Sequence, residues 1–329
     1  MCHYKHLTLL EREKLLHFRD LGKSITAIAQ LLGRNKGTIS RELRRNATNG
    51  KYLPVYAEEH YHERRKACKP EKKLAKIPKL LCHVQHRLLD CQWSPEQIAG
   101  RLRAKAGDTC VISFSTIYRA IYSGMLSSPG HSVASVVRKL RHGGKRRRKR
   151  STEERRGKIQ ISHSIDERPV EAAERSVIGH FEADTVIGRQ GRACLVTLVD
   201  RKSRYLICDK VESKTADAVG KAMSWMLMCE PVLSITPDRG KEFAKHRDVT
   251  EALDGVPFYF PEAHQPWQRG TNENTNGLLR EYFPKGKDMS DINKDDLDRV
   301  VRLLNFRPRK CLGYQTPYEV YHSKVLHFA

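Results

Sequence analysis

The chain has 329 residues, more than one ordinary domain holds, so two or three folded units are expected. Its formal charge is +23. Residues 1–150 hold 33 Lys and Arg against 11 Asp and Glu and carry +22, whereas residues 151–329 hold 28 against 27 and carry +1. A field of that sign concentrates polyanions, so it favours nucleic acid as partner over an anionic membrane surface or an acidic protein.

The cysteines and the hydropathy restrict the compartment. Nine cysteines form no C-x-x-C pair, which is typical of a protein kept in a reducing cytoplasm. Cys82, His83, His86 and Cys91 can be drawn as a zinc site, but their spacing matches no zinc finger. There is no apolar run near the ~20 residues that a membrane span needs, and no apolar signal core near residue 1. We therefore expect a cytoplasmic protein without a membrane partner.

Residues 1–50 are predicted to form a helix-turn-helix domain. Thr8 can cap a helix over residues 9–21, since Glu11 supplies the carboxylate of a capping box, and Gly22 ends it. Ser24 can cap a second helix over residues 25–32, and Gly33 then turns the chain. A third helix follows over about residues 36–45. Three short helices with tight turns are the pattern of this motif.

The third helix has the composition of a DNA-reading helix. Its apolar Ile39 and Leu43 face inward, while polar and basic side chains lie outside. Arg and Lys can read guanine edges in a major groove, and Ser or Thr can hold phosphates; a solvated basic helix in a small bundle is the alternative. The predicted DNA-binding residues are Arg34, Lys36, Thr38, Ser40, Arg41 and Arg44.

Three further segments precede the rear half. Residues 51–79 are predicted to be a basic linker or an exposed helix, because they have few large apolar residues. Residues 80–130 form a second helical unit resembling a helix-turn-helix, with a helix starting at Ser94-Pro95 and another over residues 115–122. Residues 131–172 are a basic linker, because the run Lys145–Arg150 is six consecutive cations that repel one another; contact with a DNA backbone is the alternative.

Residues 173–329 are predicted to form an α/β domain. Strands are expected over residues 181–187, 193–199, 204–211 and 232–236, with a helix over residues 215–227. The first three strands follow one another without a helix, so they are expected to be antiparallel.

Three carboxylates of this domain stand out from the others by position. Asp184 and Glu182 share one face of an apolar strand, and Glu182 is a candidate neighbour to the site. Asp238 follows another apolar strand, and Glu273 lies where a helix begins, a position that capping alone also explains. Asp200 is most simply a turn residue. Asp184, Asp238 and Glu273 together can hold two Mg²⁺ or Mn²⁺ ions, which take oxygen ligands and drive phosphoryl displacement.

Four strings of the rear half resemble the insertion-sequence-thirty family of bacterial transposases. They are Gly179-His-Phe-Glu-Ala-Asp184-Thr-Val-Ile-Gly188, Leu198-Val-Asp-Arg-Lys-Ser-Arg204, Asp238-Arg-Gly-Lys-Glu-Phe243 and Trp267-Gln-Arg-Gly-Thr-Asn-Glu273-Asn-Thr-Asn-Gly277. The resemblance extends to Gly37-Thr-Ile-Ser-Arg-Glu42, Trp93-Ser-Pro-Glu-Gln-Ile-Ala99 and Arg307-Pro-Arg-Lys-Cys-Leu-Gly-Tyr-Gln-Thr-Pro317, so it covers nearly the whole chain.

The resemblance implies a ribonuclease-H-like catalytic core whose Asp-Asp-Glu triad corresponds to Asp184, Asp238 and Glu273. The chain differs from the usual family pattern at Phe181, where relatives often have Trp, and at Arg239, where many have Asn. Arg269 and Arg280 are expected to hold DNA phosphates beside Glu273. The overall fold is thus expected to be multidomain, with N-terminal all-α helix-turn-helix units followed by this α/β core.

These observations predict a transposase that binds the terminal inverted repeats of its own insertion sequence and cleaves and joins DNA strands with divalent metal. Its partners would be double-stranded element ends and target DNA, and it would act as a homo-multimer on the bacterial nucleoid. A repressor with an inactive rear domain is one alternative, which the three carboxylates oppose. A serine or tyrosine recombinase is another, but Tyr122 and Tyr282 lie in no basic constellation that would activate them.

Overall fold

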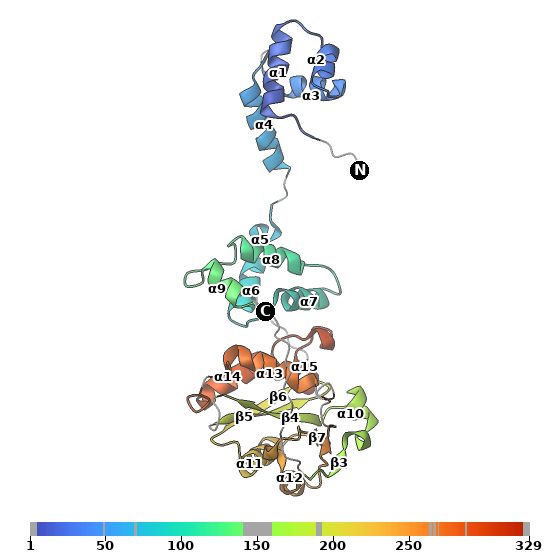
Figure 1. Cartoon of the computed structure of the whole chain (residues 1–329), viewed down its shortest axis with the longest axis vertical. Helices are drawn as coiled ribbons and strands as arrows, with labels where there is room; N and C mark the ends of the chain where they lie inside the picture. Colours follow the sequence, from blue (N-terminus) through green and yellow to red (C-terminus); the bar gives the residue numbers. More distant parts are fainter. Residues whose placement is uncertain are drawn as a thin grey trace. The chain divides into compact units, whose positions relative to one another are not determined.

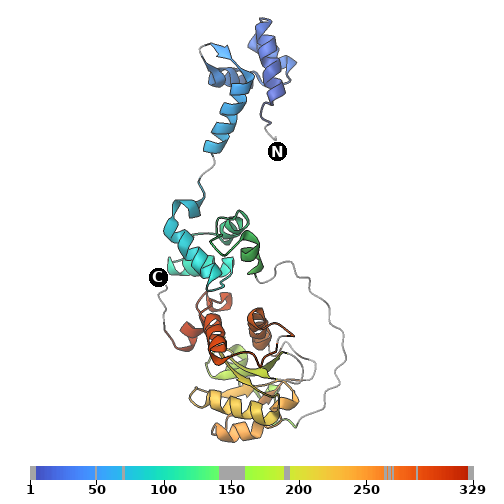
Figure 2. The same cartoon turned by 90° about the vertical axis from the view of Figure 1, so that its left-hand side faces the viewer.

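The computed structural model describes residues 5–48, 50–68, 71–140, 160–188, 193–262, 265, 268, 270–286 and 288–324. The chain divides into two compact units, Met1–Lys76 and Ile77–Ala329, here called unit 1 and unit 2 (Figures 1 and 2). No described helix is long and apolar enough to cross a lipid bilayer. The predicted basic run Lys145–Arg150 lies outside the described residues.

Unit 1 is built from helices whose ends are capped as the sequence predicts. It contains α1 (Leu9–Asp20), α2 (Ile25–Leu31), α3 (Lys36–Asn46), the short strands β1 (Ala47–Thr48) and β2 (Lys51–Tyr52), α4 (Pro54–Ala67) and α5 (Lys73–Lys76). The capping box of Thr8 and Glu11 and the Ser24 cap are both confirmed. Gly22 and Gly33 have φ values of +71° and +61°, which glycine adopts without strain.

Helix α4 completes the core of unit 1. It lies in the stretch predicted to be a linker or an exposed helix, and it is a helix whose residues are mostly exposed. Its Ala57 is nevertheless fully buried, in the cluster that contains Leu15, Ile28 and Ile39. The sequence did not predict this buried face because Pro54 and Ala57 are the two buried residues of α4, too few to make an apolar stripe.

Unit 2 begins with four helices: α6 (Pro78–Leu89), α7 (Pro95–Lys105), α8 (Phe114–Tyr122) and α9 (Val133–Arg138). Ser94 and Gln97 form a capping box at the start of α7, and Ser113 caps α8 by accepting a hydrogen bond from the Thr116 N–H. Ile98 and Ile117 are fully buried, so α7 and α8 pack through the apolar faces that the sequence predicts.

The rest of unit 2 surrounds a four-stranded sheet in the order β6-β5-β4-β7. Its strands are β4 (His180–Ile187), β5 (Cys194–Asp200), β6 (Leu206–Val211) and β7 (Ser234–Thr236). Strand β5 is antiparallel to both β4 and β6, whereas β7 is parallel to β4. A second, two-stranded parallel sheet joins β3 (His163–Ser164) to β8 (Tyr259–Phe260).

Helices cover both faces of the main sheet (Figure 1). One face packs on α11 (Ala216–Leu227) and α12 (His246–Ala252), and the other packs on α13 (Gly270–Tyr282) and α14 (Lys294–Asn305). All seven residues of β5 are buried, because alternate side chains enter the two cores. Three antiparallel strands followed by a parallel one, between two helical layers, are the ribonuclease-H-like arrangement. The shorter elements are η1 (Ile165–Glu167), α10 (Val170–Glu174), η2 (Lys241–Phe243), η4 (Lys310–Leu312) and α15 (Pro317–Tyr321).

Two polar side chains form hydrogen bonds with backbone groups at the ends and edge of the main sheet. Asp200 is the turn residue that the sequence predicts: it is buried and accepts hydrogen bonds from the N–H groups of Gly179 (2.9 Å) and Ser203 (2.7 Å). At the outer edge of β6, the Asn305 side chain accepts from the Leu206 N–H and donates to the Leu206 carbonyl, both at 2.8 Å. Asn305 therefore ties α14 to the edge of the sheet.

Candidate active site and nucleic-acid interface

The parallel pairing of β4 with β7 places two of the predicted carboxylates on neighbouring strands. The register pairs His180 with Ser234 and Glu182 with Thr236. Continued two residues further along each chain, it sets Asp184 level with Asp238, which lies just beyond the end of β7. Both residues are partly buried. Two predicted carboxylates thus follow the paired segment of neighbouring strands.

Asp184 is held by hydrogen bonds from two directions. Its Oδ2 accepts from the Asn276 side chain at 2.9 Å, and its Oδ1 accepts from the N–H of Thr185 at 2.8 Å. On β5, Thr197 donates its hydroxyl to the Asp184 backbone carbonyl at 3.1 Å. Because Asn276 belongs to α13, its bond joins this helix directly to the strand that carries Asp184.

Asp238 lies in a tight turn shared with a second carboxylate, Glu242. The Gly240 N–H donates to Asp238 Oδ1 at 2.8 Å. A Cβ atom on Gly240 would lie 2.3 Å from Glu242 Oε2 and 2.7 Å from Asp238 Oδ1, so only glycine lets both carboxylates approach this backbone. Glu242 is buried, accepts from the Thr185 hydroxyl at 3.0 Å and pairs with Lys214 at 2.6 Å.

Glu242 is the acidic neighbour that sequence reasoning did not single out. Its only signal was its place in Asp238-Arg-Gly-Lys-Glu-Phe243, where a turn brings a residue four positions on back toward the first aspartate. Its position beside Lys214 gives the carboxylate a counter-charge, and its contact with Thr185 links it to the neighbour of Asp184.

Glu273 lies in the first part of α13, one helical turn before Asn276. Residues three apart share a helix face, so Glu273 lies on the side of α13 that reaches Asp184 through Asn276. Its side chain is exposed. Within the described parts of the chain, no three His, Cys, Asp or Glu side chains gather closely enough to hold a metal ion. Asp184 and Asp238 therefore both follow the paired segment of β4 and β7, and Glu273 lies on α13, which Asn276 joins to Asp184.

The donor chemistry of this edge fits a hard divalent cation. Asp184 and Asp238 offer carboxylate oxygens, which Mg²⁺ and Mn²⁺ accept, and no sulfur or imidazole ligand is among the residues described above. A positively charged side chain, Arg280, also interacts electrostatically with Asp184. Burial lowers the pKa of Arg280, while the charge of Asp184 raises it. Arg280 Nη1 is buried with no hydrogen-bond partner among the described residues. These groups suit a site for an anionic substrate bearing oxygen ligands.

A buried ion pair supports the start of α13. Glu182 is fully buried, pairs with Arg201 and accepts a 2.9 Å hydrogen bond from the Asn272 N–H. Arg201 in turn donates to the Ala172 carbonyl at 2.7 Å, and burial lowers its pKa to about 10 against the opposing effect of Glu182. Glu182, expected to neighbour the site, thus connects the strand of Asp184 to the residue before Glu273.

In unit 1, α3 presents the predicted polar face. Ile39 is fully buried, whereas Lys36, Ser40, Arg41 and Arg44 are exposed and Thr38 is half-buried. Asn35 caps the helix by accepting from the Gly37 N–H at 2.8 Å. The exposed face of α3 therefore carries three cations and a hydroxyl side by side.

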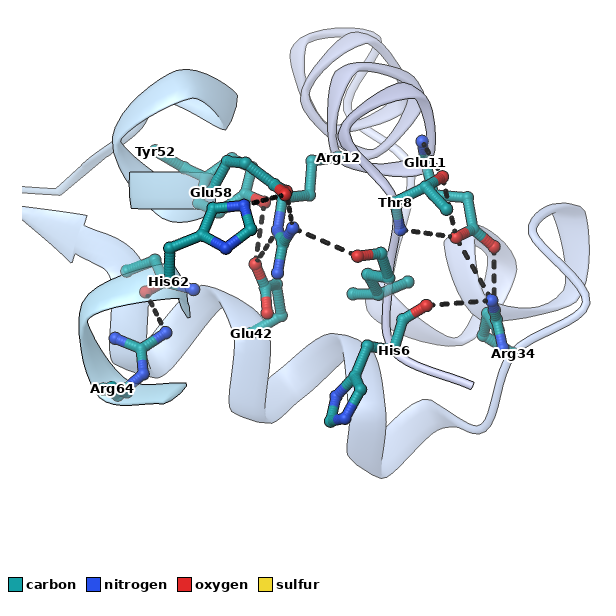
Figure 3. Close-up of polar contacts among 12 residues, drawn as sticks. His6, Thr8, Glu11, Arg12, Arg34, Glu42, Tyr52, Glu58, His62 and Arg64 are labelled. Atoms are coloured by element: carbon teal, nitrogen blue, oxygen red, sulfur yellow. Dashed lines mark hydrogen bonds and ion pairs between the residues drawn. The ribbon is translucent and has the colours of Figure 1, made fainter. Parts of the chain in front are cut away.

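Arg34 differs from the other predicted DNA-binding residues, because its guanidinium is paired inside unit 1. Its Nε and Nη2 donate to the two carboxylate oxygens of Glu11 at 2.8 and 3.1 Å, and its Nη2 donates to the His6 carbonyl (Figure 3). Its Nη1 donates to the Lys5 carbonyl. Beside it, Arg12 is buried between Glu42 and Glu58. Both arginines hold the helices of unit 1 together.

Known proteins resemble this chain both in its N-terminal helices and over nearly its whole length. Residues 3–46 match the family model of a helix-turn-helix domain. The chain is 39% identical over 330 residues to "Transposase InsI for insertion sequence element IS30A" of Escherichia coli, covering 97% of this chain and 84% of the relative. It is 37% identical over 325 residues to "Transposase for insertion sequence element IS1086" of Cupriavidus metallidurans, covering 96% and 94%.

The chain belongs to the IS30 family of transposases. A further relative, "Transposase for insertion sequence element IS4351" of Bacteroides fragilis, is 37% identical, covering 98% of this chain and 97% of the relative. Among solved structures, the catalytic core domain of BIV integrase is 20% identical, with a TM-score of 0.35, covering 44% of this chain and 93% of that one. The ribonuclease-H-like fold of this IS30-family transposase is defined by its own sheet order and by the helices on both faces of that sheet.

One predicted contact of the IS30-family transposase lies outside the described residues. The structure does not describe Arg269, which is expected to hold a phosphate, or Trp267 of the same string. Of the predicted residues beside Glu273, only Arg280 can therefore be placed, and it lies two turns along α13 on the side of Asp184.

Proposed function

We propose that the chain is a DDE-type transposase that cleaves and joins DNA strands at Asp184, Asp238 and Glu273. The parallel register that sets Asp184 level with Asp238, with α13 joined to Asp184 through Asn276, carries the proposal. Two Mg²⁺ or Mn²⁺ ions bound there would activate the attacking hydroxyl and stabilise the leaving oxygen. The chain thus needs no serine, cysteine or tyrosine nucleophile.

The surrounding residues orient the carboxylates and balance charge. The Asn276 amide fixes Asp184 Oδ2, and the Gly240 N–H fixes Asp238 Oδ1, so each side chain keeps one orientation. The guanidinium of Arg280 lies on the same side of α13 and is suited to neutralise a phosphodiester next to the carboxylates. Lys214 offsets the charge of Glu242, which limits repulsion among neighbouring acids.

DNA recognition is assigned to the helical part of the chain, residues 1–130. The exposed Lys36, Ser40, Arg41 and Arg44 of α3 suit a major groove and its flanking phosphates, and the matched helix-turn-helix family supports this role. The helices of residues 80–130 would provide a second contact to the terminal inverted repeat. Joining two element ends requires two such DNA-binding regions, so the active form is proposed to be a homo-multimer on DNA.

The test is strand cleavage of a duplex carrying an element end, with Mg²⁺ or Mn²⁺. Asp184→Asn, Asp238→Asn and Glu273→Gln keep side-chain shape and remove charge, so each is expected to abolish cleavage and leave gel-shift affinity for the duplex unchanged. Asp209→Asn is the matched control: Asp209 lies on β6 and pairs with Lys294, away from the site. It should cleave like the parent.

A second readout reports metal binding without activity. Mg²⁺ is expected to raise the melting temperature of the parent and of Asp209→Asn, but to raise that of Asp184→Asn and Asp238→Asn less, because a bound ion stabilises only the form that binds it. Cleavage by any triad variant at the parental rate would remove that residue from the site. A parent that binds element ends but never cuts them would instead support the repressor alternative.

A further inference from the structure

Inside unit 2, helix α7 lies against the segment 309–319 that follows α14. The contact is closest at Gly100, in the middle of α7. A Cβ atom on Gly100 would lie 2.2 Å from Cε1, 2.3 Å from Cζ and 2.5 Å from Cδ1 of the Tyr314 ring. Any larger residue at position 100 would collide with this ring in its present position, so the close approach of α7 to Tyr314 requires glycine here.

A buried ion pair adjoins this ring contact. Arg101 is 7% exposed; it pairs with Glu319 and donates to the Tyr314 carbonyl at 3.1 Å. Glu319 is 3% exposed and also accepts from the Thr316 N–H at 2.7 Å, which caps α15. A buried charge of either sign left alone would be strongly unfavourable, so the pair makes separation of the two surfaces costly.

The segment that receives α7 is itself held in one conformation. Tyr314 has φ +63°, in the left-handed region that a tyrosine rarely adopts. Backbone hydrogen bonds close the loop, from Tyr314 N to the Arg309 carbonyl and from Arg309 N to the Gln315 carbonyl, each at 2.9 Å. Arg309 also donates to the Leu304 carbonyl at 3.2 Å, which fastens the loop to α14 on the sheet.

The other side of α7 packs on α8, whose Ser115, Arg119 and Tyr122 are exposed. These residues are spaced three and four apart, so they form one outward face of a hydroxyl, a cation and an aromatic ring. Resting on the proposed function, this face belongs to the helices that contact the element end. A continuous series of packed elements then leads from α8 through α7, the loop and α14 to the sheet that carries Asp184.

We propose that residues 309–319 form a docking platform that fixes α7, and with it α8, relative to the active-site carboxylates. Gly100 and Arg101 are thereby positioning residues for the cleavage reaction. DNA held by α8 reaches the carboxylates at a set distance, so the platform determines which phosphodiester is cut. Loosening the platform changes the place of the cut while leaving the metal site and the DNA-reading residues intact.

The test combines Gly100→Ala with Tyr314→Gly in the full-length chain. Alanine normally stabilises a helix relative to glycine. Gly100→Ala should instead lower the melting temperature, because the new methyl group meets the Tyr314 ring. In the Tyr314→Gly background the same substitution should raise it. Gly220→Ala on α11 is the matched control, since its Cβ would meet nothing closer than 3.4 Å.

The functional readout is the map of cut positions on a labelled element-end duplex at nucleotide resolution. The parent and Gly220→Ala should cut at one position. The Gly100→Ala/Tyr314→Gly double variant, stable and binding the duplex like the parent, should cut at several positions or at a shifted one. A loss of stability alone would lower the rate without moving the cut.

Two outcomes overturn the platform: the double variant cutting only at the parental position, or Gly100→Ala raising the melting temperature in both backgrounds. The melting series needs no cleavage, so it decides whether α7 docks even where the parent fails to cut. Failure of the parent to cut would bear on the proposed function, and an unchanged cut position would bear on the platform.

Discussion

Substitutions at Glu182 can separate its contribution to the stability of unit 2 from its role in positioning α13 beside the proposed active site. Its carboxylate is fully buried, pairs with Arg201 and accepts the Asn272 N–H at the start of α13. Glu182→Gln keeps an oxygen for Asn272 but presents an amide to the Arg201 guanidinium, so a donor faces a donor. The charge of Arg201 is then left buried without its counter-ion.

The expected cost follows from burial. The side chains of Glu182 and Arg201 are 0% and 4% exposed, so solvent cannot replace the lost partner. Removing one member of such a pair destabilises a protein by about 3–5 kcal/mol. For a unit of this size, roughly 2–4 °C per kcal/mol gives a fall of about 6–20 °C in the melting temperature of unit 2. Asp217→Asn, which breaks an exposed pair with Lys245, is the control and should change little.

The double variant Glu182→Leu/Arg201→Met removes both charges. Apolar replacement of a whole buried pair is often neutral or stabilising, so most of the melting temperature should return. Cleavage of element-end DNA should stay low, because Asn272 has lost the acceptor that fixes the first turn of α13 beside Glu273. Thermal melts and cleavage rates at saturating Mg²⁺ measure the two effects separately. Parental cleavage by the stable double variant would refute the positioning role of Glu182.

Two further predictions concern unit 1. Hydrogen bonding to Arg34 lowers the pKa of Glu11 to about 2, so the stability that ionised Glu11 confers is complete above about pH 4.5 and is lost as the pH falls toward 2. The loss should be about 1–2 kcal/mol after allowance for solvent screening, and acid melts of Glu11→Gln should be flatter than those of the parent. Arg41→Ala should weaken binding of an end-repeat duplex by about 1–3 kcal/mol without lowering the melting temperature. Arg34→Ala should lower the melting temperature without weakening duplex binding. Gel shifts and thermal melts of both variants test this, and weakened binding by Arg34→Ala with an unchanged melting temperature would contradict it.

Local signals predicted much of the fold. Helix caps at Thr8, Ser24 and Ser94 were found because each motif lies within four residues of sequence, and the strand of Asp184 was found by its alternation. Strand ends shifted by one or two residues, as at β7, which begins at Ser234 where residue 232 was expected.

Partners far apart in sequence were beyond reach. Arg34 was predicted to contact DNA because its polarity matches that of α3, and no local signal indicated its pairing with Glu11, 23 positions away. The Asn276 bond to Asp184 spans 92 positions, so only the sheet pairing and the packing of α13 reveal it. Glu242 was missed for a related reason: its role depends on Lys214 and Thr185, which a linear motif does not contain.

The side-chain amide of Asn305 restricts strand addition at one edge of the main sheet. A free strand edge is a template onto which another chain can add its own strand. At Leu206 the carboxamide already takes up both the N–H and the carbonyl that an incoming strand would need. An extended segment from a neighbour therefore finds no pairing site where β6 begins. Growth of the β6 edge into a continuous intermolecular sheet is blocked at that point.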